Sequence, residues 1–111
     1  MLVLTRKPGE RIIIGQKISL ELVDIDEARR AKLTLISPEP LSLVSNNLRI
    51  QATIAATPGE PARAEFALAV SDTVVINDEI KLMAVAVKGE QVRLGIEAPG
   101  DVRIARDQDG D

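Results

Sequence analysis

The sequence predicts an all-β fold in which two interleaved five-strand copies form one compact pseudo-dimer, joined by a short connector that could be helical. Apolar and polar residues alternate along short stretches such as 18–23 and 102–105, which is the period of a strand with one buried face. The order of strands and turns in the first half recurs in the second. Phe66 is the only aromatic residue among 111, so aliphatic side chains must form the core.

The first copy is expected to span residues 1–48. The Pro8–Gly9 pair marks a turn after the opening stretch MLVLTRK, and the residues DEARR mark a second turn. Between these turns lie β-branched or alternating stretches that are typical of strands. The five predicted strands of this copy are residues 1–7, 11–15, 17–25, 31–40 and 41–44.

The second copy is expected to span residues 65–107, with strands over 66–71, 73–80, 81–87, 92–101 and 102–106. Lys88, Gly89 and Glu90 form a short hairpin, because Gly89 accepts the positive φ that other residues resist. The copies align with one extra residue in the DEARR turn. No pairs are assigned in the first strand, since the second copy lacks a Pro-Gly turn there and is expected to be shorter. The aligned pairs are Ile14 with Ile76, Ile18 with Ile80, Leu33 with Leu94, and Pro38 with Pro99.

Residues 49–64 are interpreted as the connector, and residues 108–111 as an acidic tail. A short helix capped near Asn46 or Asn47 would fit NNLRIQATIAA, and the Pro and Gly residues of TPGEPARAE would end it. Each copy is too small to bury much surface alone, so the two are expected to share one core. The alternative is that the repeat is a coincidence between two aliphatic β meanders.

Composition excludes several classes of function. The chain has no Cys and no His, which removes disulfides, thiolate nucleophiles, His-based metal sites and Ser-His catalytic pairs. Aromatic stacking platforms for nucleic acid are also excluded. A net charge of -3 argues against sequence-blind attraction to phosphate, although a local basic patch remains open. The opening residues do not resemble a signal peptide and no long apolar run occurs, so we expect a cytoplasmic protein without membrane contact.

The segments MLVLTRKPGERIIIG and GEQVRLGIEAPGDVRIARD resemble the carbon storage regulator family (CsrA, RsmA) of bacterial RNA-binding proteins. The resemblance implies five strands and a C-terminal helix per subunit, and interlaced homodimers that bind GGA motifs of messenger RNA. In this chain the first motif opens one copy and the last motif closes the other, so the resemblance implies a fused pseudo-dimer.

In the family, each RNA site combines the first strand of one subunit with the fifth strand of the other. The resemblance therefore implies one composite site that keeps both motifs. The second site would join FALAVSD to LSLVSNN, where Ser42 matches Arg103 and Ser45 matches Arg106, so its basic groups are missing. The retained RNA-binding site would consist of Leu4, Thr5, Arg6, Lys7, Val102, Arg103, Ile104, Ala105 and Arg106.

These residues suit a splayed RNA loop. The planar guanidinium of Arg can bind phosphate or the O6 and N7 edge of guanine, and strand backbone can bond other base edges. A structural alternative stays open for each residue. The cations could simply discourage edge-to-edge aggregation, and Leu4, Val102 and Ile104 fit core positions.

The sequence thus predicts a post-transcriptional regulator that binds GGA-containing loops of messenger RNA near the ribosome-binding site and represses translation, or binds a small regulatory RNA. The alternative is a protein-interaction module that has lost RNA binding and pairs with a flagellar-assembly-type antagonist. No catalysis or cofactor is expected, because the sequence has no acid/base constellation. No metal is expected, because the acidic turn of Asp24, Asp26 and Glu27 lacks the Gly and distant Glu of a calcium loop. A monomeric pseudo-dimer is favoured over a homodimer.

Overall fold

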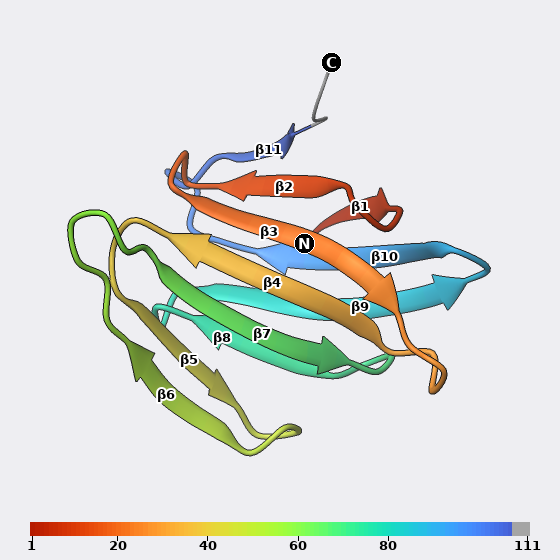
Figure 1. Cartoon of the computed structure of the whole chain (residues 1–111). Helices are drawn as coiled ribbons and strands as arrows, with labels where there is room; N and C mark the ends of the chain where they lie inside the picture. The colour runs from red at the N-terminus through yellow and green to blue at the C-terminus, as the bar shows by residue number, and fades with distance from the viewer. Residues whose placement is uncertain (108–111) are drawn as a thin grey trace.

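All regular structure in the computed structural model, which describes residues 1–107, is β (Figure 1). Residues 1–107 include no helix that could cross a membrane. The strands are β1 (Leu2–Arg6), β2 (Arg11–Ile14), β3 (Ile18–Ile25), β4 (Ala31–Ser37), β5 (Leu41–Ser45), β6 (Ile50–Ile54), β7 (Ala62–Leu68), β8 (Thr73–Ile76), β9 (Ile80–Lys88), β10 (Gln91–Glu97) and β11 (Ile104–Asp107).

The strands form two antiparallel sheets that exchange their border strands. One sheet has the order β1-β10-β9-β8-β5-β6, and the other has the order β11-β2-β3-β4-β7. The middle of each sheet therefore comes from one half of the chain, and the other half supplies the flanking strands: β1 on one side and β5 with β6 on the other in the first sheet, and β11 and β7 in the second. This arrangement confirms the predicted interleaving of two five-strand copies in one chain.

Matching hydrogen bonds show how closely the copies repeat. The amide of Gly15 donates to the carbonyl of Arg103 at 2.7 Å, and the amide of Asn77 donates to the carbonyl of Ser42 at 2.8 Å. These bonds occupy the same place in the two sheets, each where the turn after β2 or β8 meets the segment that holds the fifth strand of the other copy. The two halves share backbone geometry even where their side chains differ.

The first strand of the second copy corrects one expectation. The amide of Gly9 donates to Leu22, and that of Ser71 donates in the same way to Ala84, so the two opening turns are equivalent. Ser71 adopts a φ of 78° where Gly9 has 92°, and no residue is lost. The expectation of a shorter strand was wrong because it relied on a Pro-Gly signal that the backbone does not require. Through this alignment Leu4, Arg6 and Lys7 correspond to Phe66, Leu68 and Ala69.

The connector holds a strand and not the helix that its sequence allowed. β6 pairs with β5 along its whole length, from Leu41 opposite Ile54 to Ser45 opposite Ile50. The side-chain oxygen of Asn47 accepts hydrogen bonds from the amide and hydroxyl of Thr73 at 3.1 and 3.3 Å, so it does not cap a helix. Pairing with β5 satisfies the backbone of this segment without a helix.

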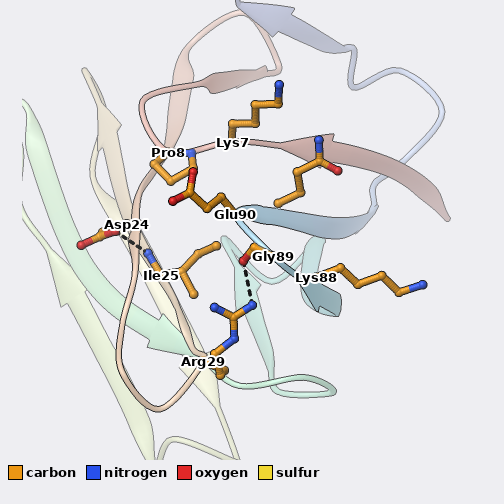
Figure 2. Close-up of a pocket in the computed structure, with 9 residues that line it drawn as sticks. Lys7, Pro8, Asp24, Ile25, Arg29, Lys88, Gly89 and Glu90 are labelled. Atoms are coloured by element: carbon orange, nitrogen blue, oxygen red, sulfur yellow. Dashed lines mark hydrogen bonds between the residues drawn. The ribbon is translucent and has the colours of Figure 1, made fainter.

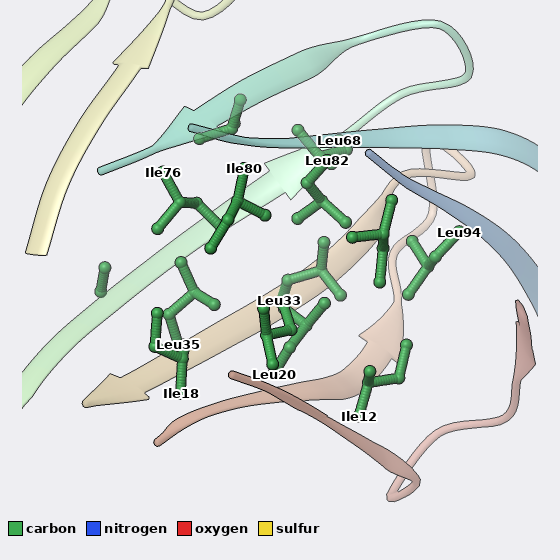
Figure 3. Close-up of a cluster of buried hydrophobic side chains, with 14 of the residues drawn as sticks. Ile12, Ile18, Leu20, Leu33, Leu35, Leu68, Ile76, Ile80, Leu82 and Leu94 are labelled. Atoms are coloured by element: carbon green, nitrogen blue, oxygen red, sulfur yellow. The ribbon is translucent and has the colours of Figure 1, made fainter. Parts of the chain in front are cut away.

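A single aliphatic core lies between the two sheets (Figure 3). Alternation places Ile12 and Ile14 of β2 in this core with no exposed surface, and Leu82 of β9 likewise. Burying a side chain of this size stabilises a fold by about 1.5 to 3 kcal/mol. Phe66 is partly buried and packs against the same cluster. The interleaved topology therefore rests on aliphatic packing shared by both halves.

Candidate nucleic-acid interface

The opening and closing strands border the two sheets on the same side of the molecule. β1 is the terminal strand of one sheet, and β11 is the terminal strand of the other (Figure 1). The Nη1 atom of Arg6 donates to the carbonyl of Arg11 in β2 at 3.4 Å. In the register of β2 and β11, Arg11 pairs with Asp107, and Ile12 pairs with Arg106. Arg6 and Arg106 therefore approach the same end of β2 from opposite sheets.

Arg6 is held within this edge. Its side chain is 4% exposed and lies on the core face of β1, like that of Leu4 at 6%. Its Nε atom donates to the carbonyl of Thr5 at 2.7 Å. The carbon stem of a buried Arg packs like an apolar side chain, which explains why Leu68 can take the corresponding place in the second copy. Arg6 thus connects β1 with β2, and RNA could use only those of its five N–H groups that remain.

Arg106 is the exposed cation of β11. Ile104 is half-buried and packs against the core, whereas Ala105 is exposed. Since side chains alternate along a strand, Arg106 lies on the same face as Ile104, which is the face toward the other sheet. A ligand that contacts both β11 and β1 could therefore reach Arg106.

Arg103 does not join this group. It precedes β11, and its carbonyl accepts the amide of Gly15 at the far end of β2. It lines a shallow hollow of about 160 Å³ together with Gly15, Gln16 and Asp101. Arg103 and Arg106 are three residue steps apart in extended chain, roughly 10 Å along the strand. Val102, next to it, is half-buried against the core.

Lys7 lies at the other limit of the site, where β1 ends. It is exposed, and its turn is closed by the Glu10 amide donating to its carbonyl at 2.9 Å. Lys7 lines a hollow of about 690 Å³ between three turns, together with the cations Arg29 and Lys88 (Figure 2). Arg29 Nη2 donates to the carbonyl of Gly89 at 2.7 Å, which joins a turn of each copy.

Arg29 and Lys88 were not among the predicted site residues. Arg29 lies in the turn after β3 and Lys88 is the last residue of β9, and no motif connects these two places along the chain. Interleaving brings them together beside Lys7. The only sequence signal that could have found them is the repeat itself, combined with the family's arrangement of subunits. Asp24 and Glu90 also line the hollow, so its charge is mixed.

The acidic turn is occupied internally. The side-chain oxygens of Asp26 accept the amide and the Nε atom of Arg30, both at 2.8 Å. The hydrogen bond from the Arg30 backbone, followed by the contact with its side chain, lowers the pKa of Asp26 below its ordinary value. Within residues 1–107, acidic side chains form no group of three or more that could hold a metal ion.

The corresponding edge on the other side of the molecule has none of these cations. Ile104 pairs with Ile14 as Leu43 pairs with Ile76, so the Arg106 position is Ser45. Ser45 is 4% exposed; its hydroxyl donates to the Thr73 carbonyl at 2.6 Å and accepts the Leu48 amide at 3.1 Å. β6 covers the outer edge of β5. The matched positions at the two edges are Arg6 and Leu68, Lys7 and Ala69, Arg103 and Ser42, and Arg106 and Ser45.

Comparisons with known proteins match two segments of the chain to one family. The sequence profile of the CsrA global regulator protein family matches residues 1–51 and 69–108. The translational regulator CsrA of Geobacter metallireducens is 57% identical over 37 residues, which cover 33% of this chain and 47% of that protein. The translational regulator CsrA of Geotalea uraniireducens is 56% identical over 39 residues, covering 35% and 49%.

A more distant relative shows the same coverage. The translational regulator CsrA of Rhodopirellula baltica is 44% identical over 36 residues, which cover 32% of this chain and 51% of that protein. This chain thus spans about half the length of the curated relatives that it matches. No solved structure matches the chain.

Proposed function

Because this chain belongs to the CsrA global regulator protein family, we propose that it regulates translation by binding RNA at the edge formed by β1 and β11. Its targets are GGA-containing loops near a ribosome-binding site, or small regulatory RNAs with the same loop. The family is one of regulators, and the expectation that the chain is not an enzyme is confirmed.

One observation carries the proposal of a single site. The β1–β11 edge has an exposed Arg106 and a buried Arg6 near the same end of β2, with Lys7 where β1 ends, whereas the matching positions at the other edge are neutral. Charge-assisted hydrogen bonds to phosphate or guanine need such groups, and each contributes roughly 1.5 to 3 kcal/mol. The β5–β7 edge has no side chain of this kind at those positions, so we expect one RNA per chain.

The chemistry follows from which groups are free. Arg106 is exposed and presents a planar fork that can hold a phosphate or the O6 and N7 edge of guanine. Lys7 is a point charge beside the hollow of the turns and would contact phosphate. Arg6 would keep β1 in position through its hydrogen bonds to the carbonyls of Thr5 and Arg11. When an RNA loop is bound across these groups, the protein would block access of the ribosome to the sequence of that loop.

Replacing Arg106 tests the proposal. The Arg106→Ser substitution installs the side chain that the second copy has at this position, so the backbone should tolerate it. A gel shift with a hairpin carrying a GGA loop should show an affinity loss of about tenfold or more. Arg63→Ser, which removes an exposed cation from β7, is the control for charge alone and should cost much less.

The burial of Arg6 favours a second candidate function, a protein-interaction module without RNA binding. Its guanidinium bonds two carbonyls of the chain, which leaves fewer donors for a nucleotide. Such a module would bind a protein partner, such as a flagellar-assembly-type antagonist. The same gel shift separates the two: absence of RNA binding at low salt by the unaltered protein would contradict the regulator and support the module.

A further inference from the structure

The outer edge of β6 differs from the other sheet borders. β6 ends its sheet, so one side of its backbone has no neighbouring strand. Terminal strands usually carry charged residues that discourage pairing with another chain. Within residues 1–107, β1 has Arg6, β7 has Arg63 and Glu65, and β11 has Arg106, whereas the sequence of β6 is IQATI. β6 is the only sheet border in that range without a charged side chain.

The sequence of β6 is also complementary to itself. When two copies of IQATI pair antiparallel about a twofold axis at Ala52, each Ile50 lies opposite Ile54 of the second copy. Each Gln51 then lies opposite Thr53, and the two Ala52 residues face each other. Ile50 and Ile54 are half-buried, and Gln51, Ala52 and Thr53 are exposed. Every cross-strand pair is thus apolar with apolar or polar with polar, and no like charges meet.

We propose that β6 is a dimerisation strand whose partner is a second copy of this chain. The two six-stranded sheets would join through their β6 strands into one continuous sheet. The self-matching register identifies the occupant, because an unrelated strand would have no reason to share this pattern. A five-residue border buries far less than a standard interface, so the dimer forms at high protein concentration and exchanges readily.

The position of β6 gives the dimer a consequence for RNA, and this step rests on the proposed function. β6 lies at the opposite side of the molecule from β11 and β2 (Figure 1). Pairing through β6 would therefore leave both RNA sites open, one on each chain. A single-site chain would become a bivalent binder, and an RNA with two suitably spaced loops would bind more tightly than one with a single loop.

Charge exchange at Ala52 tests dimerisation without RNA. In Ala52→Lys or Ala52→Glu, like charges would lie opposite each other at the twofold axis, and sedimentation velocity should show dimerisation weakened roughly fivefold or more. An equimolar mixture of the two variants should regain dimers, since Lys would then face Glu. The same substitutions at Ala28, an exposed turn residue, are the matched controls and should leave dimerisation unchanged.

Each outcome decides the proposal. An unaltered chain that stays monomeric at millimolar concentration overturns it, as does a dimer that neither charged variant weakens. Far-ultraviolet circular dichroism establishes that both variants keep the β fold. The unaltered chain and Ala52→Lys should bind a single-loop RNA with equal affinity. The tighter binding of a two-loop RNA should be lost in Ala52→Lys. Dimers that form without RNA binding would support the strand pairing and contradict the proposed function instead.

Discussion

The β1–β11 edge and the β5–β7 edge have the same backbone arrangement but different side chains. Both join the first strand of one copy to the fifth strand of the other, and both use the same turn hydrogen bonds. At the matched positions one side has Arg6, Lys7, Arg106 and the more distant Arg103, and the other has Leu68, Ala69, Ser45 and Ser42. β6 covers only the second edge.

This difference shows what covalent fusion permits. In a homodimer, every substitution appears at both edges, so neither can lose its cations while the other keeps them. In a single chain, each copy changes independently. The core positions stayed aliphatic in both copies, because both sheets depend on them for packing. Side chains at one edge could therefore diverge without loss of the fold.

Replacing the cations of the β1–β11 edge with the residues at the matching positions of the other edge should have the largest effect on RNA affinity. We expect the combination Arg6→Leu, Lys7→Ala, Arg103→Ser and Arg106→Ser to fold, because the other copy carries these residues in the same backbone. The loss of two or more charge-assisted bonds should weaken binding of a GGA hairpin about 100-fold or more, measured by gel shift.

The control for that combination removes the same number of cations elsewhere. Lys32→Ala, Arg49→Ser, Arg63→Ser and Lys81→Ala are substitutions of exposed residues outside the β1–β11 edge. A similar loss in this control would mean that overall charge, and not the edge, determines RNA affinity.

Restoring a cation to the second edge should fail to create a second site and should destabilise the fold. In Ser45→Arg the larger side chain replaces a 4% exposed hydroxyl that bonds the Thr73 carbonyl. Overpacking and the lost bond should lower the free energy of unfolding by about 1 to 3 kcal/mol, measured by urea denaturation. Native mass spectrometry should still find one RNA per chain, because β6 covers β5; two bound RNAs would show that side chains alone closed this site.

The smallest effect is expected at the turn where the copies differ by one residue. The pKa of Asp26 lies below its ordinary value of 3.8, mainly because the Arg30 amide bonds its carboxylate. The ionised form therefore adds stability that is present above the ordinary pKa and is lost as the pH falls through the lowered one. Asp26→Asn should be slightly less stable than the unaltered chain near pH 7. The difference in free energy of unfolding between the two proteins should narrow near pH 3.

Urea midpoints at the two pH values measure that gap. Asp101→Asn changes an exposed carboxyl outside this turn and serves as the matched control. A gap that widens as the pH falls would contradict the assignment of the Arg30 contacts as the cause.

Much of the fold could be predicted because it depends on local patterns. Alternation identified the strands, and the equivalence of Ile14 with Ile76 set the register between copies. The family motifs at the two ends placed β1 and β11 in one composite edge. The structure of the connector was harder to predict, because the sequence IQATI does not strongly prefer a helix or a strand. Pairing with β5 makes this segment a strand.

The sequence by itself determined that the chain repeats one aliphatic β unit and that its cations were kept in only one pair of matching end strands. Only the tertiary structure decided that Arg6 is buried, that Arg103 lies apart from Arg106, and that β6 covers the second edge. The physical reason is that alternation and residue identity act within a strand, whereas burial and edge pairing depend on neighbours from distant parts of the chain.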